Sequence, residues 1–171
     1  MREDEAKARR RRDLWLMRRP RVRGRVGGMA DFLDPGMSVL TEHECWELTV
    51  RSEIGRLAVC IGSRPEIFPV NFVTDNRTVL IRTAEGTKLA AVAANPQVAF
   101  EVDGFDAVSG LAWSVVVGGT ALVLEKLNEV YAAQELPLVP WDPAPKPIFI
   151  RIEPATISGR RFAAAGGLRE A

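Results

Sequence analysis

The pattern of apolar and polar positions from residue 37 onward predicts a mainly β protein. Three apolar runs, 55–61, 67–73 and 79–83, are separated by short turns that contain Gly, Ser, Asn and Asp. Such close spacing favours an antiparallel meander. Further strands are expected at residues 98–102, 113–124, 148–152 and 155–162. The pair Gly118-Gly119 interrupts the longest of these and predicts a bend or bulge there.

Short helices are expected between some of these strands. Thr41 and Glu44 form a capping-box pattern that begins a helix running to about Ser52. A second helix should follow Gly86-Thr87 over residues 88–94, and a third should span residues 126–136. Residues 137–147 hold five prolines and predict an irregular loop. About six antiparallel strands with short helices indicate a small antiparallel β-barrel.

Charge divides the chain into segments. Residues 1–28 contain 11 lysines and arginines and four acidic residues, a net charge of +7, which leaves −6 for the rest. We therefore expect a basic, disordered extension at 1–36, a barrel domain at 37–162 and a frayed tail at 163–171. The translated start could instead be Met29 or Met37. A basic arm would suit nucleic acid or an anionic membrane, but Trp15 is its single aromatic residue, which disfavours nucleic acid.

Composition excludes much common enzyme chemistry. The chain has one histidine and two cysteines, which argues against His-based triads, metal sites and a disulfide framework. No apolar run approaches the roughly 20 residues of a membrane helix. We expect a cytoplasmic protein, with no metal, that binds a ligand or relies on a cofactor for its chemistry.

The segment from Arg82 to Lys88 is the best candidate anion site. A strand ends at Thr83, Gly86 permits a tight turn, and a helix begins near Thr87. Helix-start N–H groups favour a phosphate, and Arg82 and Lys88 add positive charge. We expect Lys88 to be exposed. The alternative is an ordinary helix start with a solvated lysine.

A second candidate lies at Pro65–Phe72, where Pro65 and Pro69 fall in or near a strand. Proline cannot donate to a β-ladder, so an edge strand or an interrupted ladder is expected. Free backbone groups there could contact the polar edge of a planar ring, and Asn71 could add its side chain. The alternative is an ordinary edge strand.

Taken in order, several segments resemble the pyridoxamine 5′-phosphate oxidase-like flavin-binding family. The resemblance covers roughly residues 38–162. It rests on the segments Gly55-Arg56-Leu57-Ala58, Phe68-Pro69-Val70-Asn71-Phe72, Arg82-Thr83-Ala84-Glu85-Gly86-Thr87-Lys88, Asn95-Pro96-Gln97-Val98, Trp113-Ser114-Val115 and Gly159-Arg160-Arg161-Phe162. The ordered set is specific for the family, whereas no single segment is.

The resemblance implies a six-stranded antiparallel split barrel that forms a homodimer, with FMN between the subunits. Thr83, Thr87 and Lys88 would hold the FMN phosphate, with Arg82 beside them. The backbone of residues 70–71, Val70 and Asn71, would face the isoalloxazine ring. Ser114 would supply a polar contact, and Trp141 and Arg160 would close the pocket or come from the second subunit.

Two departures from the family pattern affect the expected function. The C-terminal Arg-Leu-x-x-x-Arg type motif of true pyridoxamine phosphate oxidases is absent, which argues against vitamin B6 oxidation. Leu89 stands where other members often place a second basic residue. The expected function is an FMN-dependent oxidoreductase that acts on a small molecule. A deazaflavin-dependent reductase, a flavin-binding protein without turnover and a cofactor-free interaction module stay open.

Overall fold

The computed structural model describes residues 36–139, 141 and 144–164. The expectations for residues 1–35 and 165–171 therefore lie outside the described residues. The elements follow in chain order: β1 (Met37–Leu40), α2 (Glu42–Val50), β2 (Ile54–Ile61), β3 (Arg64–Asp75), β4 (Thr78–Thr83), α3 (Thr87–Ala94), β5 (Gln97–Asp106), β6 (Leu111–Val123), α4 (Leu127–Gln134) and β7 (Ile148–Ala163).

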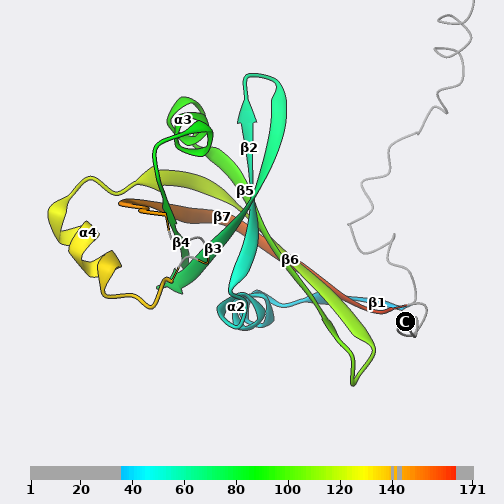
Figure 1. Ribbon diagram of the computed structural model, residues 1–171. Helices are drawn as coiled ribbons and strands as arrows, with labels where there is room; N and C mark the ends of the chain where they lie inside the picture. Colours follow the sequence, from blue (N-terminus) through cyan, green and yellow to red (C-terminus); the bar gives the residue numbers. More distant parts are fainter. Residues whose placement is uncertain (1–35, 140, 142–143, 165–171) are drawn as a thin grey trace, which may run out of the picture. The chain divides into compact units, whose positions relative to one another are not determined.

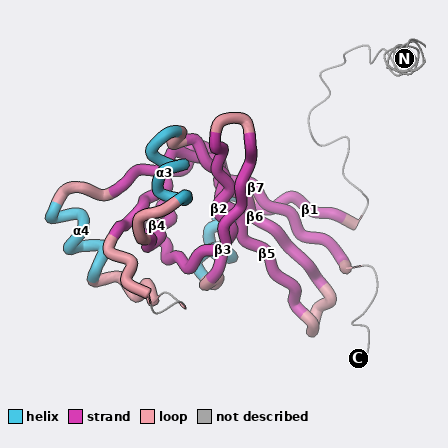
Figure 2. The backbone as a smooth tube through the Cα atoms, turned by 45° about the horizontal axis from the view of Figure 1, so that its top comes forward, coloured by secondary structure: helices cyan, strands magenta, loops and turns pink. Residues whose placement is uncertain are grey.

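Six strands form a closed antiparallel ring in the order β7, β4, β3, β2, β5, β6, with β6 pairing back to β7 (Figure 1). The expected six-stranded antiparallel split barrel is thereby confirmed. The short strand β1 pairs with the end of β7, outside the ring. Beyond the ring, a strand extension that we call the arm is formed by β1 and by residues 103–106, 111–114 and 159–163 (Figure 2).

Strand β7 differs from the sequence prediction, which divided it in two. It is one strand of 16 residues. Gly118 pairs with Thr156 and Gly119 pairs with Pro154, so Ala155 is the extra residue of a bulge. A bulge tolerates proline and bends the strand without ending it. The expected irregularity at Gly118-Gly119 is therefore present, and its effect on the opposite strand explains the apparent break.

The barrel interior is filled by apolar side chains that alternate along the strands. Leu57, Val79, Phe100, Val115 and Ile150 are among the fully buried residues. A second, smaller cluster lies outside the ring, between the outer side of the sheet, α4 and the proline-rich loop. It contains Leu80, Leu124, Ala133, Leu138 and Phe149. Because Leu138 is buried there, this cluster anchors the loop against the barrel wall.

The first helix forms as its capping box predicts. The Glu44 N–H donates to Thr41 Oγ1, and the Glu44 carboxylate accepts from the Thr41 N–H at 2.8 Å. Cys45, on the same helix, is fully buried, and burial raises the pKa of its thiol. None of the helices in the described ranges is long and apolar enough to cross a membrane.

Candidate functional site

The β3 ladder is interrupted on the side of β4. Strand β3 pairs with β2 from Arg64 to Asn71, but it pairs with β4 only from Phe72 to Asp75. Its first eight residues therefore have a strand neighbour on one side. We call the other side of residues 64–71 the open edge. The sequence predicted this interruption from the two prolines.

The prolines fit the open edge for a stereochemical reason. The Phe72 N–H donates to the Glu53 carbonyl, so this pair is a hydrogen-bonded one. Hydrogen-bonded and non-hydrogen-bonded pairs alternate along an antiparallel ladder. Pro65 and Pro69 therefore occupy non-hydrogen-bonded pairs with β2, where the missing N–H costs no ladder bond. By the same alternation, the backbone of Asn71 points toward the open edge, and that of Val70 points toward Gly55 in β2.

Lys88 stands over the open edge. Its Nζ lies 5.6 Å from the centroid of the Phe68 ring, and Phe68 belongs to the open part of β3. The side chain is half-buried, which corrects the expectation that it is exposed. Burial lowers the pKa of Lys88, and the charge of Lys146 lowers it further. Within the described part of the chain, Lys88 forms no ion pair.

Arg82 extends the positive charge but faces the outer side of the sheet. Its Nε donates to the Lys146 carbonyl at 3.1 Å, and its guanidinium lies 5.0 Å from the centroid of the Phe149 ring. Thr83 lies on the opposite side of β4, because side chains alternate along a strand. The Lys146 charge acts on Lys88, and Arg82 contacts the Lys146 backbone, so Lys146 links the other two. We call these three residues the cationic cluster.

The remaining residues of the anion motif have separate environments. Thr83 is 5% exposed, and its hydroxyl donates to the Ala84 carbonyl at 3.2 Å. Thr87 is exposed in the first turn of α3. The helix begins after Gly86, whose φ of 145° favours glycine, and no side chain caps it. Leu89 packs against the barrel core. The uncapped N–H groups of α3 are thus available to an anion.

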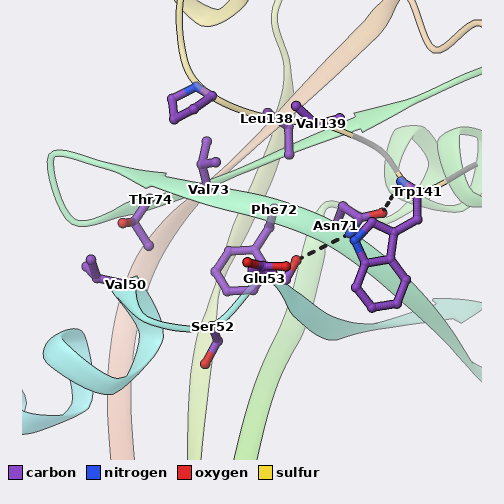
Figure 3. Close-up of a pocket in the computed structure, with 11 residues that line it drawn as sticks. Val50, Ser52, Glu53, Asn71, Phe72, Val73, Thr74, Leu138, Val139 and Trp141 are labelled. Carbon is purple, nitrogen blue, oxygen red and sulfur yellow. Dashed lines mark hydrogen bonds between the residues drawn. The ribbon is translucent and has the colours of Figure 1, made fainter.

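A cavity of about 490 Å³ lies at the other end of the open edge (Figure 3). It is bounded by the end of α2, by residues 71–74 of β3 and by residues 137–139 and 141 of the proline-rich loop. Asn71 connects its walls, because its Oδ1 accepts from the Trp141 N–H at 2.9 Å and its Nδ2 donates to the Glu53 carbonyl at 3.5 Å. Both polar atoms of the Asn71 side chain are thus hydrogen-bonded to residues of the cavity walls. Trp141 itself is 69% exposed.

Ser114 and Arg160 lie elsewhere. They pair directly across β6 and β7 in the arm. Arg160 lies eleven positions after Phe149, the neighbour of Arg82, in β7. That distance is roughly 35 Å along the strand. Within one chain, Ser114 and Arg160 therefore do not join the cationic cluster.

The sequence analysis missed Lys146 and Glu53. Lys146 was passed over because it lies in a loop whose prolines predict irregular structure. Its place beside Lys88 and Arg82 depends on the return of that loop to the barrel, which no local pattern reveals. Glu53 sits between α2 and β2, and only the fold shows that it lines a cavity. Among the described residues, no group of three His, Cys, Asp or Glu side chains is placed to hold a metal ion.

Solved structures share this architecture. A Corynebacterium glutamicum protein with a provisional pyridoxamine 5′-phosphate oxidase name is 40% identical, with a TM-score of 0.69 over 78% of this chain and 98% of its own. An FAD-binding protein from Mycobacterium smegmatis is 40% identical, with a TM-score of 0.62 over 74% of this chain and 98% of its own. An FAD-binding protein from Mesorhizobium loti is 25% identical, with a TM-score of 0.64 over 73% of this chain and 96% of its own.

The family model described as pyridoxamine 5′-phosphate oxidase matches residues 41–161, most of the chain and nearly the whole barrel. The match includes β3 with its open edge, the cationic cluster and the cavity. On this match and on the shared fold, the chain belongs to the pyridoxamine 5′-phosphate oxidase-like family.

Proposed function

We propose that this protein is a flavin-dependent oxidoreductase in which the cationic cluster holds the flavin phosphate. The observation that carries the proposal is Lys88: a half-buried ammonium beside a second lysine, with no ion pair in the described ranges. Burial and the nearby Lys146 charge both disfavour the charged form of Lys88, and an anion bound at Lys88 would offset that cost. Two of the solved relatives are named FAD-binding proteins, which supports a flavin as that anion.

Each part of the site has a role in holding such a cofactor. Lys88 and the N-terminus of α3 bind phosphate oxygens, and Lys146 and Arg82 contribute charge from the loop and β4. The open edge of β3 offers backbone groups of Asn71 to the polar edge of a ring. The residues fit both FMN, our first expectation, and FAD, because both present phosphate oxygens. When bound, a flavin supplies hydride transfer, and the protein supplies position and electrostatics.

Vitamin B6 oxidation is not the reaction that we propose. The phosphate-binding C-terminal motif is absent from the sequence. The described residues that line the cavity beside the open edge include no lysine, arginine or histidine, so these residues offer a second phosphate ester no cationic partner.

We propose that the site is completed in a homodimer. Ser114 and Arg160 are too far along the strands to reach a flavin on their own cationic cluster. The outer face of the sheet also exposes apolar side chains, among them Val39 in β1 and Val116 in β6, which is 41% exposed. Light scattering after gel filtration should give twice the chain mass. Val116→Lys, which places a cation next to Glu101 across the strands, should then give a folded monomer.

The test of the proposed function is the visible absorption spectrum of the purified protein, followed by mass spectrometry of the chromophore released on denaturation. A two-band flavin spectrum, with FMN or FAD released, supports the proposal. A single-band spectrum would indicate that the site holds a deazaflavin in place of a flavin. A colourless protein that also fails to bind added FMN, FAD and deazaflavin would contradict the proposal.

Turnover separates an oxidoreductase from a binding protein. The loaded protein should be mixed anaerobically with NADH or NADPH, and the loss of flavin absorbance followed in time. Reduction, and reoxidation by an added acceptor, supports an oxidoreductase. A flavin that stays bound and is reduced by neither donor would favour a binding protein without turnover.

A further inference from the structure

The cavity at Asn71 has an electrostatic character opposite to that of the cationic cluster. Among the described residues that line it, Glu53 is the one with an ionisable side chain. The Glu53 carboxylate has no hydrogen bond or ion pair with another described residue. The end of α2 forms one wall. Arg51, the C-cap residue of this helix, is basic but does not line the cavity.

The rest of the lining mixes polar and apolar residues, with Ser52, Asn71 and Thr74 as the polar ones. Val50, Val73, Leu138 and Val139 contribute aliphatic surface, and the indole of Trp141 borders the opening (Figure 3). A cavity of about 490 Å³ is within the range of small-molecule sites, which are typically apolar with a few placed polar groups. The lining thus suits a compact apolar body that carries a positive or hydrogen-donating group toward Glu53.

We infer that this cavity is the substrate pocket and that it selects small apolar or aromatic molecules bearing a protonated amine, with Glu53 as the specificity-determining residue. The inference rests on the proposed function, because it takes the open edge of β3 as the flavin position. Asn71 is at once the last residue of that edge and the link between the cavity walls. A molecule in the cavity would therefore lie beside a flavin bound at the edge.

A probe pair of equal shape and opposite charge tests the inference directly. Benzylamine and benzoate are titrated into the full-length protein, and dissociation constants are taken from the NMR shifts of the tryptophan indole N–H signals. The Trp141 signal is assigned with Trp141→Phe. We expect benzylamine to bind roughly three- to tenfold more tightly than benzoate, the effect of one partly exposed charge pair.

Two matched variants locate the effect. Glu53→Gln keeps the size of the side chain and should remove the preference for benzylamine. Glu125→Gln removes another exposed carboxylate, one that does not line the cavity, and should keep the preference. Equal binding of both probes, or a benzylamine preference that survives Glu53→Gln, would overturn the inference.

Flavin binding is measured on the same preparations, so that a failure of the flavin proposal can be distinguished from a failure of the substrate-pocket inference. Glu53→Gln should retain the flavin content of the parent. If saturating FMN displaces benzylamine competitively, the cavity belongs to the cofactor site and the substrate-pocket inference is overturned. Amine selectivity in a protein that binds no flavin would support the ligand class of the cavity and refute the flavin assignment.

Discussion

Within four residues of β3, the molecule presents two surfaces of opposite charge. At Phe68 the strand faces Lys88, which with Lys146 and Arg82 forms the cationic cluster. At Asn71 the strand faces a cavity in which Glu53 is the single ionisable residue of the described lining. The difference teaches that one interrupted strand can lie between a group of cations and a cavity lined by a carboxylate. Because the open edge connects the two, a cofactor anchored by its phosphate would present its ring to the cavity.

The largest expected effect comes from removing the central cation. Lys88→Ala should weaken flavin binding by about 1.5 to 3 kcal/mol, or roughly ten- to more than a hundredfold, because it deletes a charge-assisted hydrogen bond. Flavin fluorescence titration measures this change. Lys126→Ala, at an exposed lysine before α4, is the control. Benzylamine binding in the cavity should not change; equal flavin affinity in the variant and the parent would remove Lys88 from the site.

The next effect concerns the walls of the cavity. Asn71→Ala deletes both side-chain hydrogen bonds, so the loop that carries Trp141 should loosen from β3. We expect hydrogen exchange at the Trp141 amide to quicken about tenfold, in line with one lost hydrogen bond of about 1 kcal/mol or more. Benzylamine affinity should fall with it. An unchanged exchange rate would show that the buried Leu138 alone holds the loop.

A smaller effect follows from pH. The pKa of Lys88 is lowered from 10.5 by burial and by Lys146, so its neutral form appears at a lower pH than for an ordinary lysine. Affinity for inorganic phosphate should therefore decline as the pH rises toward 10, and Lys88→Arg should keep it, since arginine stays charged. As a control, benzylamine binding is measured in the same pH series, at pH values below the pKa of benzylamine itself.

As the pH rises, the Lys88 contribution to the free energy of unfolding should change in the opposite direction to the phosphate affinity. Between the lowered pKa of Lys88 in the folded protein and its ordinary value, the unfolded chain binds more protons. The Lys88 contribution to the free energy of unfolding of the anion-free protein therefore increases with pH in that window. Urea unfolding of the parent and of Lys88→Ala across this range measures it. A parent whose phosphate affinity and stability change in the same direction would contradict the assignment.

The smallest effect is expected at Thr83. Its hydroxyl already donates to the Ala84 carbonyl and is nearly buried, so Thr83→Val should weaken flavin binding by about twofold. Thr87→Val, at the exposed start of α3, should cost more if a hydroxyl contacts the phosphate. The two variants, measured by the same fluorescence titration, decide which threonine belongs to the anion site.

The parts of the fold that the sequence predicts are those governed by neighbouring residues. Thr41 and Glu44 are three residues apart and begin α2 as expected. Pro65 and Pro69 predict the open edge, because proline excludes a ladder bond wherever it stands. The strand β1 was missed, since its four residues carry little periodicity and it is defined by pairing with β7. The division of β7 at Pro154 was wrong, because the bulge depends on Gly119 in another strand.

In the candidate site, too, the features set by neighbouring residues were predicted and those set by distant residues were not. Lys88 was predicted from the helix start that contains it, but its burial was not, because that depends on Phe68 and on the returning loop. The sequence placed Asn71 on the open edge, as the structure does. It did not predict the hydrogen bond from the Trp141 N–H to the Asn71 side chain, because Trp141 is 70 residues away. The sequence alone thus indicated candidate positions and left their contacts in the fold undetermined.

The closure of the ring by β7 has a kinetic consequence. Thr83 pairs with Ile148, and Val79 pairs with Ile152, so the barrel closes through contacts between residues far apart in the chain. Proteins dominated by such contacts fold slowly, in milliseconds to seconds. Until β7 is in place, β4 and β6 present unpaired edges that can recruit strands of other chains. Aggregation during refolding should therefore rise with protein concentration, and variants that weaken β7 pairing should increase it.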